Sequence, residues 1–232
     1  MMLAALLAAS FLQQQLTAPR VREAFERHEA AAKALFQEHG VPYPPRQILL
    51  RAFKQERALE LWARRDAGFV LIKTYPICAT SGGPGPKRQE GDEQVPEGFY
   101  VISAFNPHSQ FHLSLKVSYP NASDRILGKK PLGGDVFVHG NCVTIGCMPI
   151  TDPQIEELYV IAVASKDFDK AEIPLESFPA RMTSAAVSEL SAANPAQASF
   201  WANLKEGYDW FERERVPPKV SVDAKGRYHF AK

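Results

Sequence analysis

The residues best suited to chemistry in this chain lie close together, in the stretch FVHGNCVTIGCMPITD at positions 137–152. The stretch contains one histidine, His139, and two cysteines, Cys142 and Cys147. A cysteine thiolate is a strong nucleophile, and it forms at neutral pH when a base or a helix N-terminus lies nearby. Because His139 and Cys147 are close in sequence, a loop that curls back would bring base and nucleophile together. These residue types favour a Cys–His site for acyl transfer.

Two glycines and a threonine surround the candidate catalytic side chains. Gly146 directly precedes Cys147, and a glycine there lets backbone and substrate approach the thiol closely. The backbone N–H groups of Gly146 and Cys147 are candidates for an oxyanion hole. Gly140 follows His139, and Thr144 lies shortly before Cys147. One loop could therefore hold the nucleophile, the base and their electrostatic support.

The same residue types allow three other structures. A zinc knuckle could use His139, Cys142 and Cys147, although it needs four ligands and no further His or Cys lies nearby. A Cys142–Cys147 disulfide would silence the nucleophile. The stretch could also be a plain buried turn. At the level of the residues alone, these alternatives stay open beside the acyl-transfer site.

The cysteine count gives two further expectations. The chain has three cysteines, so an exported form leaves at least one thiol unpaired or pairs it between molecules. We predict that Cys142 is a free thiol near the site, open to redox chemistry. We predict that Cys78 lies on a buried strand as an ordinary core residue.

Length, charge and the first residues limit the class of protein. The 232 residues suffice for one large or two small domains, and a net charge of +1 gives no electrostatic case for nucleic-acid binding. The apolar start MMLAALLAASFL is shorter than the ~20 residues that a bilayer span needs. It is typical of a secretory signal, although the usual preceding Lys or Arg is missing. We expect residues 1–18 to be a targeting segment and the protein to be exported.

Hydrophobic periodicity predicts an α+β fold, with a β-rich centre and helices at both ends. We expect long loops at 81–98 and 119–134, and loops of that length are usually functional. A capping-box pattern starts a helix at Thr151. Helices are expected at 17–40, 182–193 and 199–214, strands at 46–53, 58–63, 68–77, 98–105, 110–117, 135–140 and 172–179, and a hairpin at 218–230. The first three strands are expected to form an antiparallel meander.

The stretch VHGNCVTIGC resembles the signature of the L,D-transpeptidases, which have a YkuD-type catalytic domain. The segments RAFKQERALELW, LIKTYPICATSGGPGPKRQEGDEQVPEGFY, NPHSQFHLSL, YPNASDR, FPARMT and WANLKEGYDWFE resemble the YafK-like branch, in the same order. The resemblance covers roughly residues 45–230. It implies an N-terminal helix and linker at 19–45, a mostly β YkuD-type catalytic domain at 46–180, and a C-terminal helical extension at 181–232 packed on it.

The resemblance also implies roles for the residues of the loop. Cys147 corresponds to the nucleophile, which attacks an L,D amide at a diaminopimelate centre. His139 corresponds to the general base, and the carbonyl of Gly140 would orient its ring. Thr144 stands at the family's Ser/Thr position, and Gly146 belongs to the oxyanion turn. The resemblance implies no metal and no cofactor.

The implied activity is that of a periplasmic cysteine acyltransferase or amidase that remodels peptidoglycan stem peptides. It could cross-link two diaminopimelates, attach an envelope protein to a stem peptide, or release a peptidoglycan-linked envelope lipoprotein. The YafK-like branch inclines us to release, with water as the acyl acceptor. A non-catalytic peptidoglycan-binding module and a zinc protein are the alternative classes.

One departure from the family pattern concerns substrate binding. Most members carry an arginine two residues after the cysteine, where this chain has Pro149. A cation for a substrate carboxylate would then come from elsewhere, and Arg125, Arg181 and Lys73 are candidates by charge alone. For each of them, a surface or structural ion pair is the favoured interpretation.

Other substrate-binding candidates come from the strands and loops around the site. Strand alternation predicts that His112 points away from its two apolar neighbours, either towards substrate or into a structural contact. Ser114 and Tyr119 could line a cleft. The segment TSGGPGPKRQEGD, residues 80–92, could lie over that cleft or be a solvent-exposed insertion.

Overall fold

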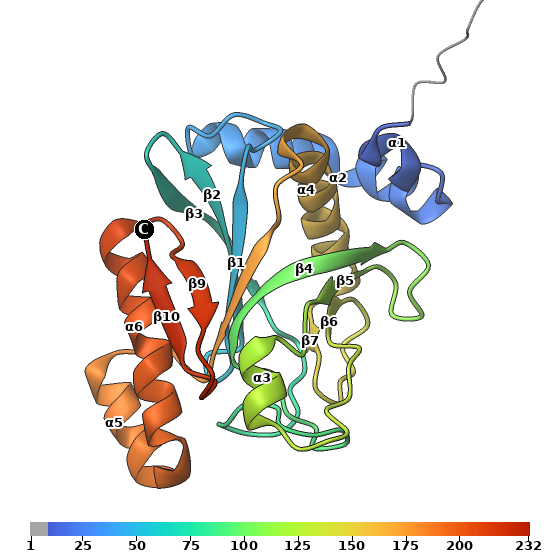
Figure 1. Ribbon diagram of the computed structural model, residues 1–232. Helices are drawn as coiled ribbons and strands as arrows, with labels where there is room; N and C mark the ends of the chain where they lie inside the picture. Colours follow the sequence, from blue (N-terminus) through green and yellow to red (C-terminus); the bar gives the residue numbers. More distant parts are fainter. Residues whose placement is uncertain (1–8) are drawn as a thin grey trace, which may run out of the picture.

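A computed structural model describes residues 9–232 of the chain, and it has an α+β fold built on one twisted sheet (Figure 1). The eight strands follow the order β3-β2-β1-β8-β4-β5-β6-β7. Their bounds are β1 Ile48–Phe53, β2 Ala58–Arg65, β3 Gly68–Pro76, β4 Gly98–Asn106, β5 Ser114–Val117, β6 Phe137–His139, β7 Met148–Pro149 and β8 Pro174–Phe178.

The first three strands form the antiparallel meander that their sequence predicts. The register pairs Leu50 with Leu61 and Leu61 with Lys73, with a shift in the β2–β3 pairing after Leu61. Strand β8 then lies between β1 and β4, parallel to β1 and antiparallel to β4. This late strand therefore joins the meander to the strands that carry the site.

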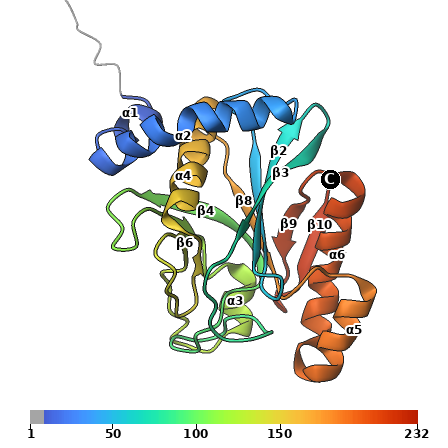
Figure 2. The same ribbon diagram turned by 180° about the vertical axis from the view of Figure 1, so that it is seen from behind.

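Helices α2 (Pro19–Glu38) and α4 (Asp152–Asp169) lie on one side of the sheet (Figures 1 and 2). Helix α4 is buried along most of its length, from Ile155 to Ser165, because the sheet lies on one face and α2 on another. Its predicted start is correct, since the side chain of Gln154 accepts a hydrogen bond from the backbone N–H of Thr151. Burial of each large aliphatic side chain here stabilises the fold by roughly 1.5–3 kcal/mol.

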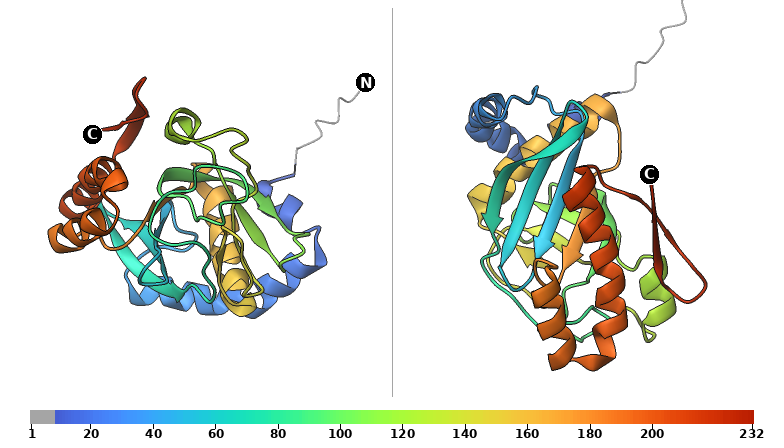
Figure 3. Two further views of the ribbon diagram at one scale, coloured as in Figure 1. Left: turned by 90° about the horizontal axis from the view of Figure 1, so that it is seen from below. Right: turned by 90° about the vertical axis from the view of Figure 1, so that its left-hand side faces the viewer.

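The C-terminal segment packs near β1 and β8 on the other side of the sheet, as Figure 3 shows. It comprises α5 (Ser184–Ala193), the short 3-10 helix η1 (Pro195–Gln197), α6 (Ala198–Glu214), and the hairpin of β9 (Lys219–Val222) and β10 (Tyr228–Ala231). Three aromatic residues at helical spacing on α6, Trp201, Tyr208 and Phe211, belong to the core. Trp201 is fully buried, and its indole N–H donates to Glu97 Oε2 at 2.8 Å.

A buried arginine ties α6 to the sheet. Arg51 on β1 is fully buried, and its guanidinium donates to Glu176 Oε2 at 2.8 Å and to Glu212 Oε1 at 2.7 Å. The rings of Phe53 and Phe211 lie 5.5 and 4.3 Å from the guanidinium carbon. Such a buried ion pair is costly to break, because removal of one partner leaves a charge without compensation.

Two of the predicted elements differ in the structure. The expected loop 119–134 contains a helix, α3 (Ala122–Leu127), which begins with a capping box between Asn121 and Asp124. The expected strand 110–117 is ordered as a strand only from Ser114, because His112 has a left-handed φ of 69° that breaks the extended backbone. The alternation argument for His112 is therefore wrong.

The N-terminal prediction falls partly outside the described residues, since residues 1–8 are not among them. Helix α1 (Phe11–Gln15) packs against α4, where Gln15 Oε1 accepts from the hydroxyl of Tyr159. Within residues 9–232, the structure has no helix that is both long and apolar enough to span a membrane.

Candidate active site

Two short paired strands carry His139 and the residue that follows Cys147 at one edge of the sheet. Strand β6 pairs in parallel with β7, with Val138 opposite Met148 and His139 opposite Pro149. Cys147 directly precedes β7, so its backbone lies one residue from the pair of Val138 and Met148. The loop between them therefore returns the backbone of Cys147 to β6, and a contact between thiol and imidazole stays a prediction.

The imidazole of His139 is buried and held in one tautomer. Its Nδ1 donates to the carbonyl of Gly140 at 2.5 Å, so Nε2 is the nitrogen with a free lone pair. The ring of Phe111 lies 4.8 Å away, centroid to centroid, and covers one side. Burial lowers the pKa of His139, and the Gly140 carbonyl opposes this shift. The side chain is therefore a neutral base at neutral pH.

Gly140 has no room for a side chain. A Cβ on it would lie 2.4 Å from Asp152 Oδ1 and 3.1 Å from Ile155 Cγ2, both on α4. The same Asp152 oxygen accepts the backbone N–H of Asn141 at 2.7 Å. The start of α4 thus fixes the carbonyl that orients the imidazole of His139.

The hydroxyl of Thr144 holds the turn that carries the thiol. Thr144 Oγ1 accepts from the backbone N–H groups of Cys147 at 2.8 Å and Gly146 at 3.2 Å, and it donates to the carbonyl of Cys147 at 2.9 Å. Both candidate oxyanion-hole donors are therefore bound to Thr144 in this state. Gly146 has a φ of 121°, a conformation that strongly favours glycine.

Cys147 is half-buried and carries a neutral thiol in this structure. Its Sγ lies 3.6 Å from the carbonyl oxygen of Asp135, to which it donates. Burial raises the pKa of Cys147, and the Asp135 carboxylate adds to the shift, while a backbone hydrogen bond at Phe137 and the charge of Lys87 oppose it. Both shifts favour the uncharged forms of the thiol and the imidazole at neutral pH.

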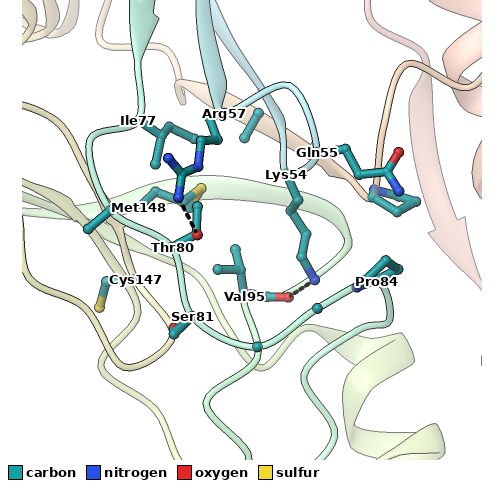
Figure 4. A pocket seen from close by; sticks show the side chains of 15 residues that line it. Lys54, Gln55, Arg57, Ile77, Thr80, Ser81, Pro84, Val95, Cys147 and Met148 are labelled. Atoms are coloured by element: carbon teal, nitrogen blue, oxygen red, sulfur yellow. Dashed lines mark hydrogen bonds between the residues drawn. The ribbon is translucent and has the colours of Figure 1, made fainter.

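A cleft of about 220 Å³ opens beside the thiol (Figure 4). The loop 81–98 forms part of its wall, through Ser81 to Pro84 and Val95. Its lining residues are Ala52, Lys54, Gln55, Arg57, Ile77, Ala79, Thr80, Ser81, Gly82, Gly83, Pro84, Val95, Cys147, Met148 and Pro179. Cys147 is the cysteine of this lining, so a ligand that fills the cleft would lie beside it.

The other two cysteines form a disulfide, which corrects two predictions. Cys78 and Cys142 are bonded, with their Cα atoms 5.4 Å apart, and Cys147 is the free cysteine. Cys142 is therefore not a free thiol, and Cys78 is not a core residue of a strand, since it lies half-buried just after β3. The bond also excludes a Cys142–Cys147 disulfide and withdraws Cys142 from any zinc site. It joins the site loop to a segment that lines the cleft.

Three other predicted residues support the site without lining the cleft. Ser114 is buried and pairs with His139 across β5 and β6. The hydroxyl of Tyr119 donates to the carbonyl of Leu132 at 3.1 Å. His112 Nε2 lies 2.6 Å from Oε1 of Glu156, a residue of α4. The carboxylate of Glu156 also binds Arg27 and His28 of α2. His112 is therefore part of a polar cluster that links α2 to α4.

The structure gives each of the three predicted cations a place outside the cleft lining. Arg125 is exposed on α3, Arg181 binds Glu60, and Lys73 binds Glu157 at 2.7 Å. The cations that do line the cleft are Lys54 and Arg57, at the turn between β1 and β2. The sequence did not predict these two residues as part of the site. Their segment, KQER at 54–57, indicates only a turn between two strands, and nothing local indicates that this turn lies beside Cys147.

Comparisons with known proteins place the site in context. Residues 50–169 match the family model YkuD, described as the L,D-transpeptidase catalytic domain, and both His139 and Cys147 lie within this segment. The protein called "Putative L,D-transpeptidase YafK" from Escherichia coli strain K12 is 36% identical over 187 residues, which cover 80% of this chain and 74% of that protein.

Solved structures with a similar chain were also found. The helical cell shape determining protein Pgp2 from Campylobacter jejuni is 15% identical with a TM-score of 0.48, over 83% of this chain and 80% of that chain. Bd1075 from Bdellovibrio bacteriovorus is 22% identical with a TM-score of 0.43, over 60% of this chain and 50% of that chain.

Proposed function

The chain belongs to the L,D-transpeptidase family, and we propose that it remodels peptidoglycan through a covalent acyl-enzyme on Cys147. One observation carries the proposal: the free thiol of Cys147 lines a cleft, and the strand that follows it pairs with β6, which carries His139 with a free lone pair on Nε2. Family membership and the likeness to YafK support a peptidoglycan-related function. The chemistry at Cys147 is the further step that we propose.

The proposed reaction starts from the neutral thiol and the neutral imidazole. The thiol turns from the carbonyl of Asp135, and His139 Nε2 takes its proton as sulfur attacks the carbonyl carbon of an L,D amide at diaminopimelate. The C–N bond then breaks, and the imidazolium returns the proton to the leaving amine. A thioester links the stem peptide to Cys147. An acceptor, activated by His139 in the same way, attacks the thioester and restores the thiol.

The oxyanion of the tetrahedral intermediate needs hydrogen-bond donors. We propose that the backbone N–H groups of Gly146 and Cys147 serve this purpose once they exchange Thr144 Oγ1 for the substrate oxygen. In the present state Thr144 holds the turn in shape, and its hydroxyl keeps both donors satisfied. Because the exchange replaces a neutral acceptor with an anion, it favours the transition state over the resting enzyme.

We propose water as the acceptor, which would make the enzyme an amidase that releases a protein from the stem peptide in the periplasm. The resemblance to the YafK-like branch supports this version. An amine acceptor would instead give cross-links or protein attachment, through the same acyl-enzyme.

A specific observation favours a second candidate function, a non-catalytic peptidoglycan-binding module. In the resting state the thiol of Cys147 is neutral, and Thr144 occupies both candidate oxyanion-hole donors.

Mass spectrometry of muropeptides incubated with the protein separates these versions. The samples are tetrapeptide monomers and tripeptides that carry a protein-derived Lys or Arg, with Cys147→Ala and His139→Gln as controls. Loss of the Lys or Arg adduct without new dimers, absent in both variants, would support the releasing amidase. New dimers would indicate a cross-linking transpeptidase. An unchanged sample, together with binding of the same muropeptides, would leave the binding module and overturn the catalytic proposal.

A further inference from the structure

The cleft beside Cys147 contains a guanidinium with no acidic partner. Arg57 lies in the turn between β1 and β2 and lines the same cavity of about 220 Å³ as the thiol. Its Nη2 donates to Thr80 Oγ1 at 3.1 Å, as Figure 4 shows. None of the ion pairs among residues 9–232 includes Arg57. Most of its five N–H donors are therefore free to bind a ligand.

The other charged groups near the cleft already have partners. Lys54, the second cation of the lining, donates to Glu97 Oε1 at 2.9 Å and to the carbonyls of Gly85 and Val95. Glu56, which precedes Arg57, accepts the backbone N–H of Arg181 at 2.8 Å. Since the remaining lining residues are uncharged, Arg57 is the uncompensated charge of this cleft within the described residues.

The position of Arg57 is fixed by the surrounding backbone. Its N–H donates to the carbonyl of Lys54 at 3.2 Å, and its own carbonyl accepts from Ile77 at 2.7 Å. Thr80, which holds the guanidinium, follows Cys78 by two residues, and the disulfide ties that segment to the site loop. The guanidinium itself is exposed, and its hydrogen bond to Thr80 favours one position, which reduces the conformational entropy lost on binding.

We propose that Arg57 binds a carboxylate of the stem peptide and thereby selects substrates whose leaving residue has a free carboxylate. The inference rests on the proposed function. In an α-linked leaving residue, only the amide nitrogen and the Cα separate the scissile carbonyl carbon from the carboxylate carbon. Because Cys147 and Arg57 line the same cavity, a substrate whose scissile carbonyl contacts Cys147 can place that carboxylate beside Arg57, where a guanidinium binds it through two parallel hydrogen bonds.

The test combines variants of the enzyme with variants of the substrate. Synthetic tetrapeptides whose fourth, leaving residue is an α-linked Lys are prepared with all carboxylates free, with a carboxamide at the leaving residue, and with a carboxamide at the side-chain carboxylate of diaminopimelate. Kinetics of wild type, Arg57→Gln and Arg57→Lys are compared. Arg213→Gln, which removes an exposed guanidinium on α6, is the matched control. Thermal melts establish that each variant folds.

We expect Arg57→Gln to lower kcat/KM about 10- to 100-fold on the free tetrapeptide, as for the loss of a charge-assisted hydrogen bond. Wild type should show a similar loss when the leaving residue carries a carboxamide, whereas Arg57→Gln should be indifferent to that change. Arg57→Lys should recover part of the activity, because it restores the charge without the two-point geometry. If the loss of kcat/KM in wild type, and its absence in Arg57→Gln, occur with the diaminopimelate carboxamide instead, the assignment to the leaving residue is overturned.

A binding measurement keeps this inference separate from the proposed reaction. Calorimetry with Cys147→Ala and Cys147→Ala/Arg57→Gln measures the affinity for the free tetrapeptide without turnover. Weaker binding by the double variant would support the role of Arg57 even if wild type fails to cleave any substrate. Equal affinity of the two proteins, no measurable binding by either, or an equal loss of kcat/KM on all three substrates would overturn it.

Discussion

Replacement of both Cys78 and Cys142 by serine should lower the free energy of unfolding by about 4 kcal/mol. The bond closes a loop across a sequence separation of 64. For a loop of that length, the chain-entropy relation gives a loss of about 14 cal/mol/K in the unfolded state, or about 4 kcal/mol at 25 °C. Cys142 is exposed and Cys78 half-buried, so the change in burial adds little.

Urea denaturation in a Cys147→Ser background measures this effect without thiol exchange. The oxidised protein is compared with the double serine variant and with the reduced protein, and the two should agree. A thiol titration of the wild-type protein in denaturant provides the control, with one reactive thiol before reduction and three after it. Three thiols before reduction would refute the bond. A stability difference below about 1 kcal/mol would refute the chain-entropy reasoning.

Four further predictions concern the site and its support. Labelling of Cys147 by iodoacetamide should have a pH midpoint above the ordinary thiol pKa of about 8.5, because burial raises its pKa; a lower midpoint would indicate a preformed ion pair. Burial alone would raise the pKa of Glu156, but hydrogen bonds from an arginine and two histidines outweigh it and lower the pKa. Its stabilisation is therefore full above the unfolded value of about 4.3 and lost as the pH falls through the folded value, so Glu156→Gln should flatten the acid dependence of the urea midpoint. Gly140→Ala should lose activity and about 1–3 kcal/mol of stability in thermal melts through a clash with α4, whereas Gly134→Ala, which meets open space, should not. Arg51→Met should lower the free energy of unfolding, measured by urea denaturation, by about 3–5 kcal/mol. The loss should be smaller when its partners Glu176 and Glu212 are replaced by apolar residues as well.

Much of the fold follows from patterns that are local in sequence. The meander of β1, β2 and β3, the start of α4 and the buried stripe of α6 were all predictable, because period and capping act over a few residues. The position of β8 between β1 and β4 was not predictable in this way. Periodicity identifies a strand but does not name its partner, which depends on contacts between residues far apart in the chain.

The same distinction applies to the site. His139, Gly140 and Cys147 could be proposed from the sequence because one short loop contains them. The bond between Cys78 and Cys142 was missed, because two segments that are distant in sequence meet only in the folded chain. Arg57 was missed for the same reason.

The place of β8 sets the smallest part of this chain that can be moved into another protein. The segment that matches the family, residues 50–169, ends before β8 begins at Pro174. A fragment cut at that boundary would leave β1 and β4 with unpaired edges in the middle of the sheet, and exposed edges of this kind promote aggregation. Chimeras between relatives should therefore exchange the segment through Phe178 as one block, with the strand that completes the sheet included.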